Sequence, residues 1–338
     1  MYLRQTKQPV TENFDMYVNH FLKAENNHIF NDQKFFNMHA TRQNDSYMQL
    51  VRNSDSRVFA TIAFYDDAQG NFSSPLRGTF GGLSLNSQTN IANIEKFFQI
   101  SLSYLKLNGG RRFTIKCPPT SHDPALFAIF FNIMLRNGFK VSAQELSYDV
   151  NVTDNAFIDR LEYGKARRIK KCIQEGFHAE KLAPAKYKEA YEIISSNRIR
   201  RGFPITMTYQ QLEDLCETFP ERIHFFAVYS AHENGDMIAA SVCIEITNKI
   251  FYVFYWGDIA GVEAYSPVVF LVSFIYDYCQ RNNFRILDVG ASTVEGQPNY
   301  GLIKFKRDLG FQESLKASFK YSEMHSPETA ADSTNMLS

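Results

Sequence analysis

Apolar positions recur along the chain with two spacings, and their order predicts alternating strands and helices. Runs of about 4–8 alternating or continuous apolar residues predict strands, whereas apolar residues three and four apart predict helices. Strands are predicted at 47–51, 57–65, 112–117, 139–152, 177–182, 223–229, 237–246, 250–256, 285–290 and 311–321. Helices are predicted at 91–107, 124–137, 184–198, 209–219, 267–282 and 299–309. In the mixed segment 11–36, Phe14, Tyr17, Val18, Phe21 and Leu22 fit one face of a further helix.

The same order of elements occurs twice in the chain. Phe113 and Phe284 are 171 positions apart, and the Gly-Phe pairs that begin at Gly138 and Gly310 are 172 apart. Near-equal offsets indicate a duplicated unit. We therefore expect an α/β (α+β) fold with two tandem domains, each a mixed, mostly antiparallel sheet flanked by helices. Their predicted bounds are 1–152 and 177–322, with a basic linker helix at 153–176 and a disordered tail at 323–338.

Composition narrows the compartment and the partners. Of the 338 residues, 44% are hydrophobic and 21% are charged. A helix that spans a membrane needs about 20 apolar residues in a row, and the sequence has no such run. The N-terminus has no signal-peptide core, so we expect a cytoplasmic protein. Lys+Arg 36 against Asp+Glu 36 gives no net charge, so there is no global attraction to nucleic acid. Five widely spaced cysteines favour reduced thiols and no metal site.

The segment from the strand at 285–290 to the strand at 311–321 carries the most specific pattern. Asn299 is positioned to cap a helix in which Leu302 and Leu309 share a face, and Gly310 ends that helix. This order resembles the closing segment of the GNAT acyltransferase superfamily. The helix tyrosine of many GNAT members is replaced by Lys306.

Phe305-Lys306 followed by Leu309-Gly310 resembles the signature of the FemABX-like branch, whose characterised members transfer aminoacyl groups to peptidoglycan precursors. The resemblance implies two GNAT-type domains over essentially the whole chain. The first copy has Phe127 where the second has Asn299, so we expect only the second to keep the donor-side chemistry. The pyrophosphate loop for coenzyme A that GNAT enzymes carry should follow Trp256, and the sequence there does not fit it.

Two clusters of basic residues are candidates for binding phosphate or carboxylate. The first surrounds Arg167 and Arg168 in the linker helix, and the second, with Arg198 and Arg201, precedes a Gly-Phe-Pro turn. Such residues pair with anions through charged hydrogen bonds. The alternatives are a solvated helix face for the first cluster and a cationic helix end for the second. We assign both provisionally to the acceptor.

The candidate catalytic and donor-binding residues lie in the second half. GNAT folds splay two parallel strands around the donor, which here would be 250–256 and 285–290. Candidate donor contacts are Trp256, Ser292, Asn299 and Lys304, and candidate catalytic residues are Lys306, Tyr255, Asp258 and Glu245. Lys306 would hold a donor phosphate or the oxyanion, or else be an exposed lysine. Asn299 would contact the donor, or else only cap its helix. Asp258 and Glu245 are alternative bases.

These patterns predict an N-acyltransferase that moves an acyl group from acyl-CoA or an acyl carrier, as a co-substrate, to an amine acceptor. A second hypothesis is aminoacyl transfer from tRNA to a cell-wall precursor, and a third is a non-catalytic binding module of the same fold. The absence of a basic surplus favours the first over the second, because tRNA binding usually requires a basic surface.

Overall fold

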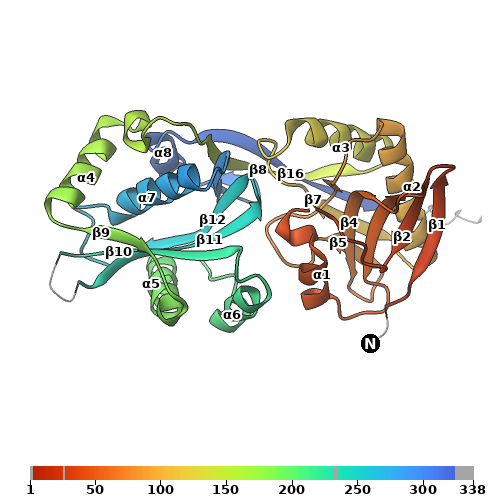
Figure 1. Ribbon diagram of the computed structural model, residues 1–338, viewed down its shortest axis with the longest axis horizontal. Coiled ribbons are helices and arrows are strands. Elements are labelled where there is room, and N and C mark those ends of the chain that lie inside the picture. Colours follow the sequence, from red (N-terminus) through yellow and green to blue (C-terminus); the bar gives the residue numbers. More distant parts are fainter. Residues whose placement is uncertain (1–2, 26, 232–234, 324–338) are drawn as a thin grey trace, which may run out of the picture.

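The computed structural model describes residues 3–25, 27–231 and 235–323. Nearly all of the segment predicted as a disordered tail, 324–338, lies outside the described residues. Figure 1 shows two halves side by side, joined by long strands at the centre of the molecule. The first half contains β1 (Thr6–Thr11), β2 (Phe14–Val18), β3 (Ser46–Arg52), β4 (Val58–Asp66), β5 (Asn71–Ser74), β6 (Ser84–Leu85), β7 (Arg112–Lys116), β8 (Lys140–Asn151), α1 (Gln33–His39), α2 (Ile91–Leu107) and α3 (Pro124–Arg136).

The second half repeats this alternation of strands and helices and begins with the helix α4. It contains α4 (Tyr163–Gln174), β9 (His178–Lys181), α5 (Tyr187–Arg200), α6 (Tyr209–Thr218), β10 (Ile223–Tyr229), β11 (Met237–Thr247), β12 (Ile250–Asp258), α7 (Pro267–Arg281), β13 (Ile286–Ala291), β14 (Thr293–Val294), β15 (Gln297–Pro298), α8 (Tyr300–Asp308) and β16 (Gln312–Ser322). In both halves antiparallel strands lead to one parallel pair, β5 beside β7 and β12 beside β13. The predicted α/β fold with mixed, mostly antiparallel sheets is confirmed.

The two halves exchange their closing strands. The sheet order β5-β7-β16-β8-β13-β12 places the last strand of the second half beside β7 of the first. The last strand of the first half, β8, lies in turn beside β13 of the second. The two exchanged strands also pair with each other, from Gln312 opposite Asp149 to Lys320 opposite Lys140. One continuous sheet therefore crosses the molecule, and each half is completed by the other.

The helices begin where side chains can satisfy their free backbone amides. Asn90 accepts a hydrogen bond from the Asn93 amide at the start of α2, and Asp123 does the same at the start of α3, before Pro124. Both helices therefore begin at the residue predicted from the sequence. The linker helix predicted at 153–176 is shorter, since α4 covers only Tyr163–Gln174. None of the helices in the described ranges is long and apolar enough to cross a bilayer.

The helix predicted within segment 11–36 is wrong. Phe14 to Val18 form strand β2, in which Phe14, Met16 and Val18 pack into the core of the first half. Phe14 and Val18 are four positions apart, which fits one face of a strand as well as one face of a helix, and Phe21 and Leu22 lie beyond the end of the strand. Asn19 and Phe21 also have positive φ angles, 58° and 55°, which end any regular element there.

Helices cover both faces of the second-half sheet and fix the strands between them. α4, α7 and α8 lie on one face, and α5 and α6 lie on the other (Figure 1). Buried apolar side chains fill both layers, with Leu271 and Phe251 in one core and Ile194 and Val242 in the other. The strands are therefore packed on both faces. A place where two of them separate is held open by this packing.

Candidate functional site

β12 and β13 separate partway along their length and form a wedge. They pair in parallel only from Ile250 opposite Ile286 to Tyr252 opposite Asp288. Beyond that point β12 continues beside β11, whereas β13 continues beside β8. A cavity of about 260 Å³ opens between the diverging ends. It is lined by Thr79, Phe80, Pro119, Ser147, Arg198, Thr206, Tyr252, Val253, Phe254, Tyr255, Trp256, Asp288, Val289, Gly290, Ala291, Leu302, Lys306 and Lys316.

Lys306 lies at this wedge and is buried. Its side chain extends from α8, is 1% exposed, and donates from Nζ to the carbonyls of Gly290 at 2.8 Å and Ala291 at 3.1 Å. Burial lowers the pKa of Lys306 to about 7, and the negative charge of Asp288 limits that shift. The ammonium is 5.4 Å from the centre of the Tyr148 ring. Of the two positions open from the sequence, the structure places Lys306 inside the site and not on the surface.

Asn299 caps the helix that carries Lys306. Its side chain accepts a hydrogen bond from the Leu302 amide at 3.0 Å. Leu302 and Lys306 stand one helical turn apart and both line the cavity. Asn299 itself does not line the cavity, so its observed contact is that of a cap.

Tyr255, a predicted catalytic residue, and Trp256, a predicted donor contact, come from the β12 side of the wedge and line the cavity. The Tyr255 hydroxyl contacts the Thr206 hydroxyl, and the Trp256 ring lies edge-on to Phe305 with centroids 5.9 Å apart. Arg198 also lines the cavity, with its guanidinium 4.9 Å from the centre of the Tyr255 ring. A cation over an aromatic face is held in place by the ring's electron density.

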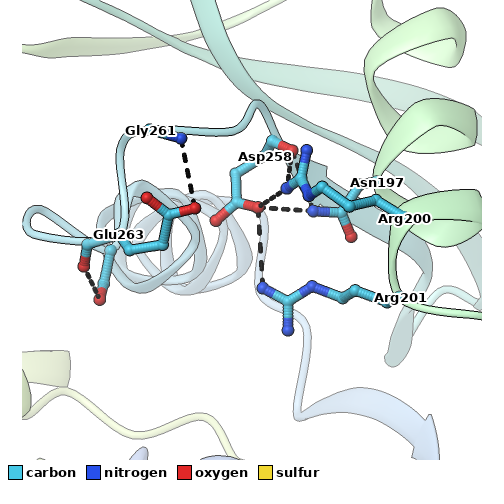
Figure 2. Close-up of polar contacts among 7 residues, drawn as sticks. Asn197, Arg200, Arg201, Asp258, Gly261 and Glu263 are labelled. Atoms are coloured by element: carbon cyan, nitrogen blue, oxygen red, sulfur yellow. Dashed lines mark hydrogen bonds and ion pairs between the residues drawn. The ribbon is translucent and has the colours of Figure 1, made fainter.

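Asp258 stands at the end of β12, outside the cavity lining, in a cluster of cations. Figure 2 shows its carboxylate between Asn197, Arg200 and Arg201. Asn197 donates to Oδ1 at 2.5 Å, and the two arginines lie 3.2 and 3.8 Å from the same oxygen. Burial raises the pKa of Asp258, and both arginines oppose the rise. Arg201 is thus paired with a carboxylate of its own chain.

The next acidic residue on the loop after β12 is also engaged. The Glu263 carboxylate accepts a hydrogen bond from the Gly261 amide at 3.2 Å (Figure 2). Backbone hydrogen bonds at Glu263 and Gly261 lower the pKa of this carboxyl. Two carboxylates therefore lie between β12 and α7, Asp258 at the end of the strand and Glu263 in the loop. The Glu263 carboxylate is the one bound to a backbone amide of the loop, that of Gly261.

Three other predicted residues lie apart from the wedge. Glu245 is near the opposite end of β11, where its carboxylate lies 2.7 Å from Nε2 of His224. Lys304 is exposed on α8 and pairs with Asp308 at 2.8 Å. Ser292 is buried beyond β13, and its hydroxyl has no hydrogen-bond partner among the described residues. None of the three lines the cavity.

Arg167 and Arg168 of the linker helix lie elsewhere as well. Arg168 donates from Nη1 to the carbonyl of Glu263 at 3.0 Å, which ties α4 to the loop before α7. The Arg167 side chain is exposed, with its guanidinium 5.9 Å from the Tyr163 ring. The structure thus separates these two arginines from Arg198 at the wedge, although the sequence assigned all of them to one acceptor.

Two residues that the sequence did not single out are central to the site. Asp288, at the last parallel pair of β13, is 1% exposed and accepts a hydrogen bond from the Gly290 amide at 2.6 Å. Nε2 of His122, in the loop before α3, lies 2.8 Å from its other oxygen. A charged residue in an otherwise apolar strand was a signal for Asp288. No local signal marks His122, because the strand exchange brings it there from the other half.

Comparisons with known proteins agree with this architecture. No protein-family model and no curated protein matches the chain. The crystal structure of FemX superposes with a TM-score of 0.70 at 11% identity, covering 90% of this chain and 97% of that one. The structure of L-PGS from Bacillus licheniformis gives 0.54 at 11%, covering 84% and 86%. Likeness at these identities shows the fold, so the chain has a GNAT-like fold of the FemX arrangement, as predicted.

Proposed function

We propose that the chain is an N-acyltransferase that holds an activated acyl donor in the wedge between β12 and β13 and transfers the acyl group to an amine. The observation that carries this proposal is Lys306, a buried lysine bound to two backbone carbonyls at the point where the strands part. In its charged form the ammonium has three donors, and two of them are used on these carbonyls. The third is free to face a reacting carbonyl.

Acyl transfer needs the donor carbonyl and the amine held together and a hydrogen-bond donor for the developing oxyanion. Among the described residues, no strand pairs with the inner edge of β12 beyond Tyr252, so this part of its backbone is open to an extended donor chain. Lys306 would supply the oxyanion donor. A single such donor changes kcat by roughly 10²–10³.

Arg198 is the cation best placed for the acceptor. It lines the cavity from the α5 side and is held over Tyr255, whereas Arg201 is paired with Asp258. A phosphate or carboxylate on the acceptor would bind at Arg198 and leave its amine directed into the wedge. A small amine and a cell-wall precursor would both satisfy this requirement.

Aminoacyl-tRNA is a second candidate donor, favoured by the loop shown in Figure 2. In GNAT enzymes the pyrophosphate of coenzyme A lies on the loop that follows this strand, and here that loop carries Asp258 and Glu263. Glu263 already binds the Gly261 amide, and Asp258 already pairs with Arg200 and Arg201, so the donors that a pyrophosphate would use there are engaged. Arg167 and Lys170 expose positive charge on α4 nearby, which suits a larger phosphate-bearing donor.

The test compares donors and one matched pair of variants. Transfer is measured with acetyl-CoA or longer acyl-CoAs and small amines, and with aminoacyl-tRNA and a UDP-linked muropeptide. We expect Lys306→Met to lower kcat by about 100-fold or more with the active donor. Lys304→Met, on the exposed side of the same helix, should stay within about two-fold.

Thermal shift with each substrate separates the remaining hypothesis from these two. Binding of a ligand to the folded protein raises its midpoint of unfolding. Stabilisation without transfer by any donor would favour a non-catalytic binding module. Equal loss of activity in the two lysine variants would contradict the role of Lys306.

A further inference from the structure

A histidine and an aspartate from different halves form a buried pair at the apex of the wedge. His122 belongs to the loop before α3, and Asp288 belongs to β13. Their side chains are 5% and 1% exposed, and Nε2 of His122 lies 2.8 Å from Oδ2 of Asp288. The ring of His122 is further held edge-on against Phe80, with centroids 5.3 Å apart. Both side chains are therefore fixed.

The pair lies between two cavities. Asp288 lines the 260 Å³ cavity of the wedge. His122 lines a second cavity of about 620 Å³ between the two halves. Phe80 and Pro119 line both cavities and so form their common wall. Asp288 faces the space in which the acceptor amine would react, and His122 supports it from behind.

Hydrogen bonds connect this pair to Lys306. Oδ1 of Asp288 accepts from the Gly290 amide at 2.6 Å, and the Gly290 carbonyl accepts from Nζ of Lys306 at 2.8 Å. A carboxylate and an ammonium are thus both oriented by one glycine at the edge of β13. The φ angle of Gly290 is 75°, a left-handed conformation that other residues adopt only with strain.

The proposed transfer requires a base, and other carboxylates fit that role poorly. Glu245 lies near the far end of β11, and Asp258 is held by Asn197 and Arg200 outside the cavity lining. Asp149 accepts from the Ser314 hydroxyl at 2.8 Å and does not line the cavity. Asp288 combines a place in the lining with a carboxylate held by two donors. Such orientation is what a general base needs.

We infer that Asp288 is the general base of the proposed acyl transfer and that His122 is its positioning residue. In this step the amine nitrogen forms a bond to the acyl carbon while the bond from that carbon to the donor's oxygen or sulfur breaks. The electron pair of the broken bond goes to the leaving group, which takes a proton from water. Asp288 accepts the proton released from the amine and returns it to solvent when the product leaves. This inference rests on the proposed function.

Several titratable groups surround the pair. Lys306 approaches from α8, Asp149 from β8 and Tyr252 from β12, and His28 lies near His122. Burial raises the pKa of Asp149 and lowers that of His28 to about 3, so His28 stays neutral in the working range.

The experiment uses the full chain and three substitutions at the pair. Asp288→Asn should lower kcat by about 100-fold or more, with KM for the donor little changed. His122→Gln keeps an amide donor near the position of Nε2. It should therefore retain kcat within several-fold. His122→Ala should lower kcat more than it changes KM.

Two controls separate a role in catalysis from a role in folding. His224→Gln alters a histidine that lies away from the wedge, with Nε2 2.7 Å from the Glu245 carboxylate, and it should leave kcat unchanged. Spectra of ¹⁵N-labelled protein should show a His122 Nε2 proton protected from exchange in the wild type and not in Asp288→Asn. This measurement reports the pair without requiring activity.

The outcomes distinguish this inference from the proposed function on which it rests. A wild-type chain that transfers nothing from any donor would contradict the proposed function. An active wild type whose Asp288→Asn variant keeps kcat within about three-fold would overturn the inference alone. A kcat that is unchanged in His122→Ala would remove His122 from it.

Discussion

The Lys306 ammonium lies in an unusual environment for a charged group. Its side chain is buried, two of its hydrogen bonds go to uncharged carbonyls, and Asp288 is the acid that counters its loss of hydration. Burying an ammonium without a direct ion pair destabilises the folded state. Such a residue persists where its chemistry is used, which is consistent with the role proposed for Lys306.

The first prediction concerns stability and pH. The pKa of Lys306 is lowered from 10.5 to about 7, so between these values the unfolded chain binds more protons than the folded one. The contribution of this group to the free energy of unfolding therefore rises with pH across that window, by up to about 1.4 kcal/mol per pH unit. Urea unfolding of the wild type and Lys306→Met at pH 7.5, 8.5 and 9.5 should show their difference changing in favour of the wild type. Parallel curves would contradict the lowered pKa.

The second prediction concerns activity and pH. Because the charged form of Lys306 is the proposed oxyanion donor, its contribution should fade as pH rises through about 7. The ratio of kcat/KM for the wild type to that for Lys306→Met isolates this contribution from the ionisation of the amine substrate. That ratio should decline on the alkaline side. A ratio that increases with pH would indicate that the neutral amine is the active form.

Sequence patterns located one side of the site and missed the other. Lys306, Tyr255 and Trp256 were found because each follows a strand or helix signal within its own half. Asp288 carried a weaker signal as a charge in an apolar strand. His122 could not be found, since its pairing depends on a contact across 166 positions that only the strand exchange creates.

At the scale of single elements, α8 carries Lys306, and Asn299 caps the start of α8. The Asn299 side chain satisfies the Leu302 amide, which an alanine cannot do. Asn299→Ala should lower the free energy of unfolding by about 1 kcal/mol. Because the first turn of α8 would then fray, transfer should also fall.

A second helix provides the matched control for this third prediction. Asn90 caps α2 in the same way, by accepting from the Asn93 amide at 2.8 Å, and α2 is in the first half. Asn90→Ala should show a similar loss of stability in urea unfolding with transfer unchanged. Similar losses of transfer in both variants would mean that general destabilisation, and not the position of Lys306, is responsible.

Elements with explicit end signals were predicted well from the sequence. α2 was predicted with the bounds that the structure shows, because Asn90 begins it and Asn108-Gly109 ends it. β2 was mistaken for a helix because its short alternation has no such signal at either end. Strands β1 and β6 were also missed, since their residues pair with the sheet without an apolar pattern of their own.

At the scale of the whole molecule, the exchange of β8 and β16 makes each half incomplete alone. Fragments 1–154 and 155–338 each contain a closing strand whose partners are in the other fragment. We expect neither fragment to unfold cooperatively by itself, because each would expose a long sheet edge. Mixing them should restore a 1:1 complex with a cooperative transition, detected by light scattering and circular dichroism. A stable monomeric fragment with a sharp transition would contradict this fourth prediction.

The duplication was predicted from offsets in the sequence, whereas the exchange was not. Offsets report the order of elements along the chain, and that order is the same whether β16 returns to its own half or crosses to the other. The choice is made by side chains at the centre of the sheet, such as Phe319, which packs into the first-half core and lies edge-on to Phe131. The half with which β16 pairs is therefore seen only in the three-dimensional structure.

The position of β16 has a consequence for biosynthesis. A ribosome releases β7 long before it translates Gln312–Ser322, the strand that must lie beside β7. The first half therefore emerges with an open edge beside β7, and its sheet can close only after Gln312–Ser322 has been translated. During that interval the nascent chain presents an edge that another nascent copy could occupy, so yield in a cell should depend on how quickly translation reaches the last strand.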